Sequence, residues 1–287
     1  MSNLLHIYIH IIKWVFLLAL IFYPFELLAP AERGQPFHKR VFNLVYAALY
    51  LALVLFVLSP VVSLFTAQVL ALSAGGLLPQ LAGPGSSFIA QLSFAVVFAV
   101  FLDFCQYWQH RWQHTVPLLW QTHRFHHTET ATNATTQGRH HFLHYFVATI
   151  SYLPVLVIFG TQTPHYIALF LISMLWGFVN HANLRLNLGP LTPIISGPQW
   201  HRIHHSNLHE HQDKNFASFF PFIDILFGTY YRPQPDEYPP SGLSAKDEKP
   251  VLSEATFVPF VNLARRARGS VKKGTPQFTG SEETETL

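Results

Sequence analysis

The chain has little charge and a single cysteine. Only 11% of its 287 residues are charged, whereas a soluble domain usually carries about 25%. Because Cys105 stands alone, the sequence excludes an internal disulfide and an iron–sulfur cluster built from cysteines of this chain. The net charge of +3 gives no indication of nucleic-acid binding. The sequence also lacks the G-x-S-x-G motif of serine hydrolases, a Rossmann fingerprint and a haem-attachment signature.

Apolar runs dominate what is present, and half of the residues are hydrophobic. Runs of this kind predict membrane spans, and they cover Ile11–Pro30, Val41–Leu72, Phe88–Leu102, Phe142–Phe159 and His165–Phe178. Pro60 is expected to kink the second run or to split off an interfacial piece. The third run meets no helix breaker before His114, so one helix is expected to continue out of the membrane. We therefore predict an all-α, polytopic membrane helical bundle of about five spans.

The distribution of basic residues predicts the orientation of these spans. Lys39 and Arg40 place the first loop in the cytosol, and the uncharged loop 75–87 then lies outside. More arginines follow the third and fifth runs, at Arg111, Arg124, Arg139, Arg185 and Arg202. The amino terminus is thereby predicted outside, and the dense histidine clusters are predicted in a helical metal-binding cap on the cytosolic face.

Composition divides the chain into three regions. Residues 1–87 are predicted to be amino-terminal membrane anchor spans, and residues 88–232 to be the catalytic region. Residues 233–287 are rich in Pro, Ser, Glu, Asp and Lys, which predicts a disordered cytosolic tail. Within the tail, LARRARGSVKK is compatible with binding to anionic lipid headgroups or with a solvated basic patch.

Histidine is the anomalous residue, with 18 copies. The spacing H-x3-H occurs once and H-x2-HH twice, and these motifs with one isolated histidine comprise His110, His114, His123, His126, His127, His181, His201, His204 and His205. Side chains three or four positions apart share one face of a helix, and the adjacent histidines diverge enough to reach two different ions. A lone histidine such as His181 is more often hydrogen-bonded than a ligand. The repeated boxes nevertheless predict a metal site, and imidazole suits Zn, Cu, Fe and Ni alike.

These residues resemble the fatty acid hydroxylase/sterol desaturase superfamily of membrane non-haem di-iron oxygenases. The resemblance extends from about Phe88 to Arg232 and includes DFCQYWQHRWQH, TETATNATTQGRHH, NHAN and HRIHHS followed by DKNFASFFPFIDILFGTYY. It implies that the nine histidines named above bind two iron ions, for which zinc can substitute in a preparation, and that O2 is a co-substrate. His141 is a further candidate ligand. It lies in HFLH where relatives commonly have H-P-L-E, so His144 takes the acidic position.

Metal-bound imidazoles usually donate their second N–H to a carboxylate or a carbonyl. Asp103 lies two helical turns before His110, and the other residues predicted to surround the ligands are Asp224, Asn180 and His144. Asp213 and Asn215 are alternative candidates for this role. His209 and His211, which follow the last box, are expected by default to be exposed loop residues, with the alternative that one of them holds a ligand loop.

The resulting hypothesis is a membrane-bound, O2-dependent di-iron lipid oxygenase, a hydroxylase or desaturase of a sterol, fatty acyl or related lipid. It implies a lipid substrate from the bilayer and an external electron donor, ferredoxin- or cytochrome b5-like, because the chain has no redox motif of its own. An integral multi-pass location is expected, in a bacterial inner membrane or, in a eukaryote, the endoplasmic reticulum. The alternatives are a zinc-binding membrane protein and a metal transporter, although transporter ligands usually lie near the middle of the spans.

Overall fold

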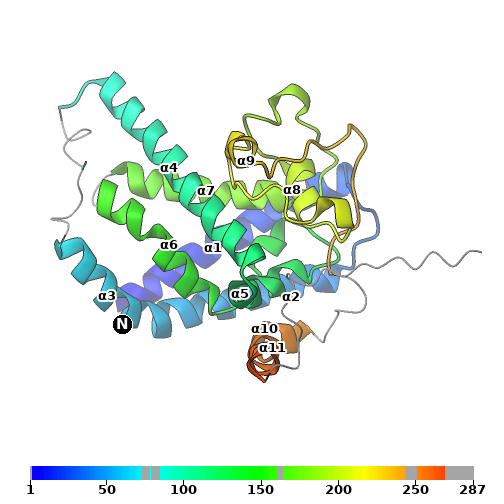
Figure 1. Cartoon of the computed structure of the whole chain (residues 1–287), viewed down its shortest axis with the longest axis horizontal. Helices are drawn as coiled ribbons and strands as arrows, with labels where there is room; N and C mark the ends of the chain where they lie inside the picture. Colours follow the sequence, from blue (N-terminus) through cyan, green and yellow to red (C-terminus); the bar gives the residue numbers. More distant parts are fainter. Residues whose placement is uncertain (1, 73–77, 79–84, 161–163, 244–250, 269–287) are drawn as a thin grey trace, which may run out of the picture.

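The computed structural model describes residues 2–72, 78, 85–160, 164–243 and 251–268 (Figure 1). All regular elements in these residues are helical, which confirms the all-α prediction. Two isolated β-bridges, Pro30–Leu184 and Ser206–Ser241, also occur in them. The α-helices are α1 (Ser2–Leu28), α2 (Phe37–Leu53), α3 (Ser59–Leu72), α4 (Phe88–Thr115), α5 (Pro117–His127), α6 (His144–Phe159), α7 (Pro164–His181), α8 (Pro198–His204), α9 (Phe222–Phe227), α10 (Val251–Thr256) and α11 (Val258–Ala267). The shorter turns are η1 (Val54–Leu58), η3 (Ala134–Gly138), η4 (Gly189–Leu191) and η5 (His209–His211).

Three described helices are long and apolar enough to cross a membrane: Asn3–Leu28, Phe37–Val69 and Phe88–Thr115. The last of these has 28 residues and is therefore about 42 Å long, more than the hydrocarbon core of a bilayer requires. Its continuity confirms that one helix extends from the third apolar run to His114. The fourth run forms the shorter apolar helix α6 and the fifth lies in α7, while the span count and the orientation stay predictions.

The second apolar run is helical without interruption, so Pro60 does not split it. A π-helical turn, η1, joins α2 to α3 and ends two residues before Pro60. Proline cannot donate a backbone hydrogen bond to the preceding turn, and a wider turn is one way for a helix to absorb that loss. The sequence therefore predicted correctly that the helix is irregular near Pro60, but it did not predict a π-helical turn. The loop predicted at 75–87 falls largely outside the described residues.

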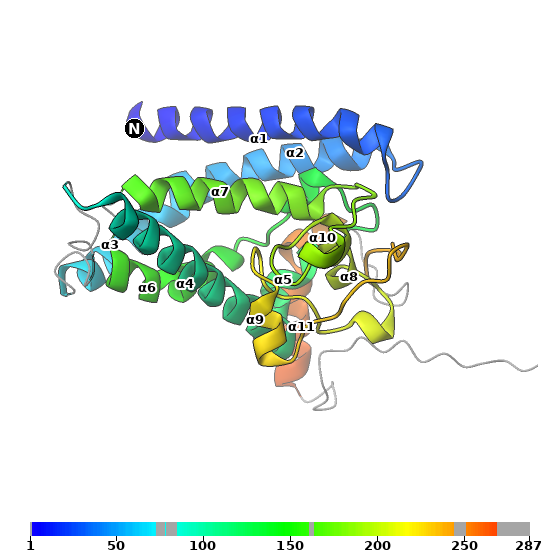
Figure 2. The same ribbon diagram turned by 90° about the horizontal axis from the view of Figure 1, so that it is seen from above.

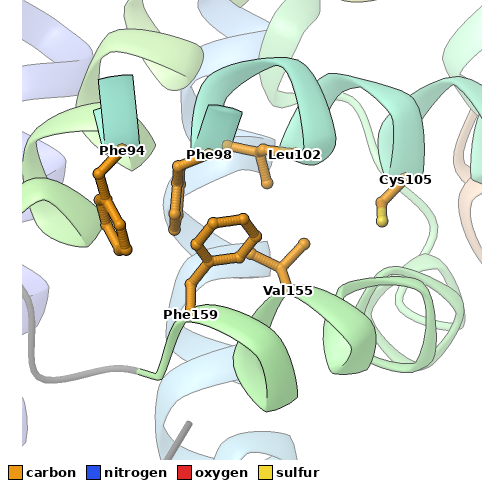
Figure 3. Close-up of a cluster of buried hydrophobic side chains, with 6 residues drawn as sticks. All are labelled: Phe94, Phe98, Leu102, Cys105, Val155 and Phe159. Carbon is orange, nitrogen blue, oxygen red and sulfur yellow. The ribbon is translucent and has the colours of Figure 1, made fainter. Parts of the chain in front are cut away.

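Apolar side chains at helical spacing hold α4 against α6 (Figure 3). Phe94, Phe98 and Leu102 follow one another at intervals of four residues and therefore share one face of α4. The ring of Phe159 meets Phe94 and Phe98 edge-on, at centroid distances of 5.5 and 4.9 Å. Val155, one turn before Phe159, is fully buried in the same cluster. This contact forms an apolar core beside the part of α4 that precedes the histidines.

Buried polar contacts join the amino-terminal helices to the rest of the protein. Glu26, near the end of α1, accepts backbone hydrogen bonds from Ala134 and Asn183 at 2.8 and 2.7 Å. Its other carboxylate oxygen pairs with the buried Arg40 of α2. The first two helices therefore hold residues of the predicted catalytic region in place.

The structure departs from the predicted disordered tail over two stretches. In residues 233–243, backbone carbonyls of Gln234 and Pro239 accept hydrogen bonds from Gln199 and Arg202 of α8, each at 2.8 Å. Residues 251–268 form α10 and α11. A polar composition predicted disorder because it offers little apolar surface to bury, but here the backbone carbonyls satisfy buried side chains. Residues 244–250 and 269–287 lie outside the described residues.

Candidate metal centre

The nine predicted ligands form two clusters at the end of α4. His110, His114, His123, His127 and His204 form the first cluster, and His126, His181, His201 and His205 form the second. Within each cluster, one ring nitrogen of every residue lies within 4.8 Å of the others. The adjacent histidines of each H-x2-HH box separate, one to each cluster, as the sequence predicted. Each box therefore contributes to both clusters.

The nitrogens lie at the spacing expected of ligands that share an ion. Nε2 of His181 lies 3.0 Å from Nε2 of His126 and 3.1 Å from Nε2 of His205. In the first cluster, Nε2 of His127 lies 3.1 Å from Nε2 of His114 and 3.2 Å from that of His204. Metal–nitrogen bonds of about 2.0–2.1 Å at right or tetrahedral angles separate the nitrogens by roughly 2.8–3.4 Å.

Backbone carbonyls fix the orientation of four ligand rings. In each of these rings, Nδ1 lies at hydrogen-bond distance from a backbone carbonyl oxygen. The pairs are His110 with Phe216 at 2.8 Å, His126 with Arg139 at 3.1 Å, His181 with Gly177 at 2.7 Å and His204 with Lys214 at 2.9 Å. A carbonyl only accepts, so Nδ1 carries the hydrogen and Nε2 of the neutral ring keeps its lone pair. Lone pairs directed at one another across about 3 Å repel, and a cation between them removes the repulsion. The donor set therefore fits a metal ion in each cluster.

Burial keeps the ligand imidazoles neutral. It is the main cause that lowers the pKa of His126, His127, His204 and His205 well below the usual 6.5, and the neighbouring imidazoles lower it further. A neutral imidazole is the form that binds a metal ion. Among the described residues, Nε2 of His110 and both ring nitrogens of His123 are buried without a hydrogen-bond partner. Buried polar atoms are seldom left unpaired, so these nitrogens also fit a metal ion.

The sequence predicted that Asp103 and Asp224 contact the ligand rings. Their hydrogen bonds go instead to the backbone of the loop 216–220. Asp103 accepts backbone hydrogen bonds from Ser218, Phe219 and Phe220 at 2.6–3.1 Å. Asp224 accepts them from Phe216 and Ala217 at 2.8 and 2.9 Å. The carbonyl of Phe216 in turn orients His110. The carboxylates therefore act on the ligand through the loop, whose position over α4 is not visible in local spacing.

Asn180 also acts through this loop. Its amide donates to the carbonyl of Ser218 at 2.7 Å and accepts from the hydroxyl of Ser196 at 3.0 Å, so these two partners lie in the loop and beside it. Asp213, the alternative candidate, lies with a carboxylate oxygen 3.6 Å from Nδ1 of His114. This is an ion-pair distance rather than a hydrogen bond, and it makes Asp213 the carboxylate that faces a ligand ring.

His141 lies outside both clusters. Its Nδ1 accepts the backbone N–H of Leu143 at 3.2 Å, a local contact that occupies the atom. His144 stands behind the ligands, where its Nδ1 lies 3.0 Å from the amide nitrogen of Gln113. It stacks on His140 at a centroid distance of 4.3 Å. His144 therefore lies beside the clustered histidines, at the predicted position. The ring nitrogens of His141 do not join either cluster.

Sequence reasoning missed His140, which stacks on the ligand His126 at 5.1 Å with nearly parallel rings. Burial lowers its pKa to about 4. The available signal was the pair His140–His141 in GRHH, which resembles the adjacent pairs of the two boxes. The sequence did not show which of the two histidines points toward the clusters, because that depends on the backbone conformation after η3.

Of the two histidines that follow the last box, His209 is exposed, as expected by default, whereas His211 follows the alternative and holds a loop. His211 is buried, with Nδ1 2.9 Å from the hydroxyl of Ser206 and Nε2 2.9 Å from a carboxylate oxygen of Glu237. Ser206 directly follows the ligand His205. The contact links the end of the ligand helix to the stretch 233–243.

Comparison with known proteins supports this assignment of the site. Residues 95–229, which include all nine clustered histidines, match the family model described as fatty acid hydroxylase. These residues form a fatty acid hydroxylase domain. Alkylglycerol monooxygenase of Homo sapiens is 34% identical over 129 residues, covering 45% of this chain and 28% of that protein. The Delta(7)-sterol 5(6)-desaturase ERG3A of Gibberella zeae is 31% identical over 138 residues, covering 48% and 38%.

The ornithine lipid hydroxylase OlsE of Rhizobium tropici is 28% identical over 177 residues, covering 61% of this chain and 53% of that protein. The chain thus spans between about a quarter and a half of the length of these curated relatives. No solved structure matches it. The relatives confirm the resemblance to the fatty acid hydroxylase/sterol desaturase superfamily.

Proposed function

We propose that this protein is a membrane-bound lipid oxygenase that hydroxylates or desaturates a sterol, fatty acyl or related lipid at a C–H bond. The observation that carries the proposal is the pair of all-histidine clusters inside a fatty acid hydroxylase domain. The relatives are named as a monooxygenase, a desaturase and a hydroxylase of lipids. The clusters are proposed to hold two iron ions, with O2 as the co-substrate.

The histidines of the two clusters would supply only neutral nitrogen ligands. When bound, iron supplies the reactivity with O2 that attack on an unactivated C–H bond requires. The protein contributes orientation, because the four Nδ1–carbonyl contacts direct the Nε2 lone pairs into the clusters. A ring held in this way loses little freedom when it binds a metal ion.

The chain also excludes water from the clusters. Phe216 is buried beside the first cluster, with its ring 5.5 Å from that of His110, and it belongs to an apolar core that includes the buried Trp200. The buried Trp120 packs against His114, at a centroid distance of 5.2 Å. Apolar walls of this kind protect a reactive centre from side reactions with water.

A substrate from the bilayer is consistent with the position of α4. The apolar contact of α4 with α6 ends at Cys105, five residues before His110, which corresponds to about 7.5 Å along the helix. An acyl or sterol group lying along α4 would therefore bring a C–H bond toward the first cluster while its apolar part stays out of water. Electrons would come from an external ferredoxin- or cytochrome b5-like donor on the cytosolic side, because the sequence offers no redox motif of its own.

Metal analysis of variants that differ in one histidine tests this proposal. Wild-type protein and His209→Ala, which changes an exposed histidine outside the clusters, should each retain about two iron ions per chain. His204→Ala should lose iron, because it removes a ligand of the first cluster. The same three proteins are then assayed for lipid oxidation that requires both O2 and a reductant, and His204→Ala should be inactive.

Two outcomes would contradict the proposal. Full lipid oxidation by His204→Ala would exclude the clusters as the reaction site. Stoichiometric zinc together with no O2-dependent product would favour the zinc-binding alternative, and metal-dependent uptake into vesicles would favour transport. The substrate class follows from comparing the lipids of a deletion strain with those of the complemented strain. In the deletion strain the substrate should accumulate and the oxidised product should disappear.

A further inference from the structure

Helix α11 turns its apolar side away from the protein. Phe257, just before the helix, and Phe260 and Val261 within it are 72%, 45% and 44% exposed. These positions lie at intervals of three and four residues, so their side chains share one face. Leu252 of the preceding helix α10 is 66% exposed. Together, these four residues form an exposed apolar stripe.

The opposite side of the helix pair faces the protein, where the small Ala255 is buried and polar side chains contact α5. Glu254 of α10 is fully buried in an ion pair with Arg124 of α5, at 3.0 Å. Asn262 of α11 donates a hydrogen bond to Gln121 of α5 at 2.9 Å. A helix on the surface of a soluble domain has the reverse pattern, with its apolar stripe inward. An outward apolar stripe of this size marks a surface that is covered by lipid or by a partner.

The charge of this segment favours an anionic lipid surface. Between Ala255 and Lys273 the sequence contains no acidic residue, and its basic residues are Arg265, Arg266, Arg268, Lys272 and Lys273. The first two lie in the last turn of α11, next to the apolar stripe. Aromatic and aliphatic residues beside arginines are the pattern of helices that lie in a membrane interface.

The position of α11 in the fold agrees with this pattern. In Figure 2, α11 runs across the long axis of α1 rather than along it. Because α1 is long and apolar enough to span the bilayer, an element across it lies in the plane of the membrane. Phe260 also contacts the ring of Phe142, at 6.0 Å, two residues before the apolar helix α6 begins. This places α11 at the depth where an apolar helix begins.

We propose that α10–α11 is a membrane-docking element that inserts the apolar stripe between lipids and binds anionic headgroups through Arg265, Arg266 and Arg268. The contacts of Glu254 and Asn262 fasten it to α5, the helix that carries three clustered histidines. Docking would thereby couple the membrane surface to the support of the metal centre. The proposal requires only that the protein sits in a bilayer, and it stands independently of the chemistry at the clusters.

The test locates a fluorescent label on the stripe in the full-length protein. Cys105→Ala removes the natural cysteine, and Phe257→Cys then carries a polarity-sensitive probe, with Glu210→Cys as an exposed control outside the stripe. The protein is reconstituted into vesicles of phosphatidylcholine, with or without phosphatidylglycerol. Nitroxide-labelled lipids should quench the label at position 257 and aqueous iodide should not, most clearly with phosphatidylglycerol. The label at position 210 should show the opposite behaviour.

A charge variant tests the headgroup contact separately. Each basic residue close to an anionic surface contributes about 1 kcal/mol, or about fivefold in partitioning. Arg265→Gln should therefore reduce the lipid quenching at position 257 in the phosphatidylglycerol vesicles and leave it unchanged in pure phosphatidylcholine. Arg232→Gln, which removes an exposed arginine outside α11, should have no effect in either.

Leu252→Cys repeats the measurement on α10, so a folding defect of one labelled variant does not decide the result. If both stripe positions are quenched by iodide and not by lipid nitroxides in both vesicle types, the stripe faces water. The membrane-docking proposal would then be wrong, and the surface would be available to a protein partner instead. Equal effects of Arg265→Gln and Arg232→Gln would exclude a specific contact of α11 with anionic headgroups.

Discussion

The apolar half of the molecule and its histidine half are stabilised in different ways. In the apolar half, α4 and α6 meet through side chains such as Phe98 and Phe159 at helical spacing, while other apolar residues of the same helices face outward. In the histidine half, rings and carboxylates are buried and paired with backbone groups of distant segments. Dispersion contacts tolerate adjustment, but a buried polar group without its partner is costly. The metal centre should therefore be the more sensitive half.

Asp103 marks the boundary between the two halves. It lies one residue after Leu102, the last residue of α4's apolar Phe94–Phe98–Leu102 row, and it binds backbone N–H groups more than one hundred residues away in the chain. The same helix thus carries the apolar core and the support of the ligand loop. Substitutions along α4 can separate the two contributions.

The largest effect is expected for Asp103→Ala. The change leaves three part-buried backbone N–H groups of the loop 216–220 without their carboxylate acceptor, which should lower the free energy of unfolding by about 3 kcal/mol. The Phe216 carbonyl would no longer hold His110 in place, so iron content should fall as well. Thermal unfolding and metal analysis measure the two effects. Asp103→Asn keeps one acceptor oxygen and should restore part of both, and equal iron in all three proteins would contradict the role of the loop.

An intermediate effect confined to stability is expected for Phe98→Ala. Phe98 is fully buried between α4 and α6, and the cavity left behind should cost about 3 kcal/mol. Iron content per folded chain should stay at the wild-type level, because Phe98 lies twelve residues before His110, or about 18 Å along α4. Phe88→Ala, at a position 77% exposed on the same helix, should change neither quantity. Loss of iron at unchanged unfolding temperature would refute the separation of the two halves.

The two halves also differ in what the sequence predicts. Hydropathy and spacing predicted the long helices and the sharing of each H-x2-HH box between two clusters, because both depend on residues a few positions apart. The partners of Asp103 and Asp224 could not be predicted, since they depend on how a loop more than one hundred residues from Asp103 folds over α4. The sequence could not show which of His209 and His211 holds a loop for the same reason, because the partner Glu237 lies in a stretch whose composition resembles disorder.

The smallest effect is expected for Asp213→Asn. Its carboxylate lies 3.6 Å from Nδ1 of His114 and is 48% exposed, so water screens much of the interaction. Removing a carboxylate behind a ligand ring typically weakens metal binding by about 10–100-fold, and the exposure of Asp213 places the expected loss near the lower end of that range. Competition with a chelator measures it, with Asp236→Asn as the control at an exposed acid that pairs with Arg185 instead. A loss as large as that of Asp103→Ala would mean that the direct contact, rather than the loop, holds the first cluster together.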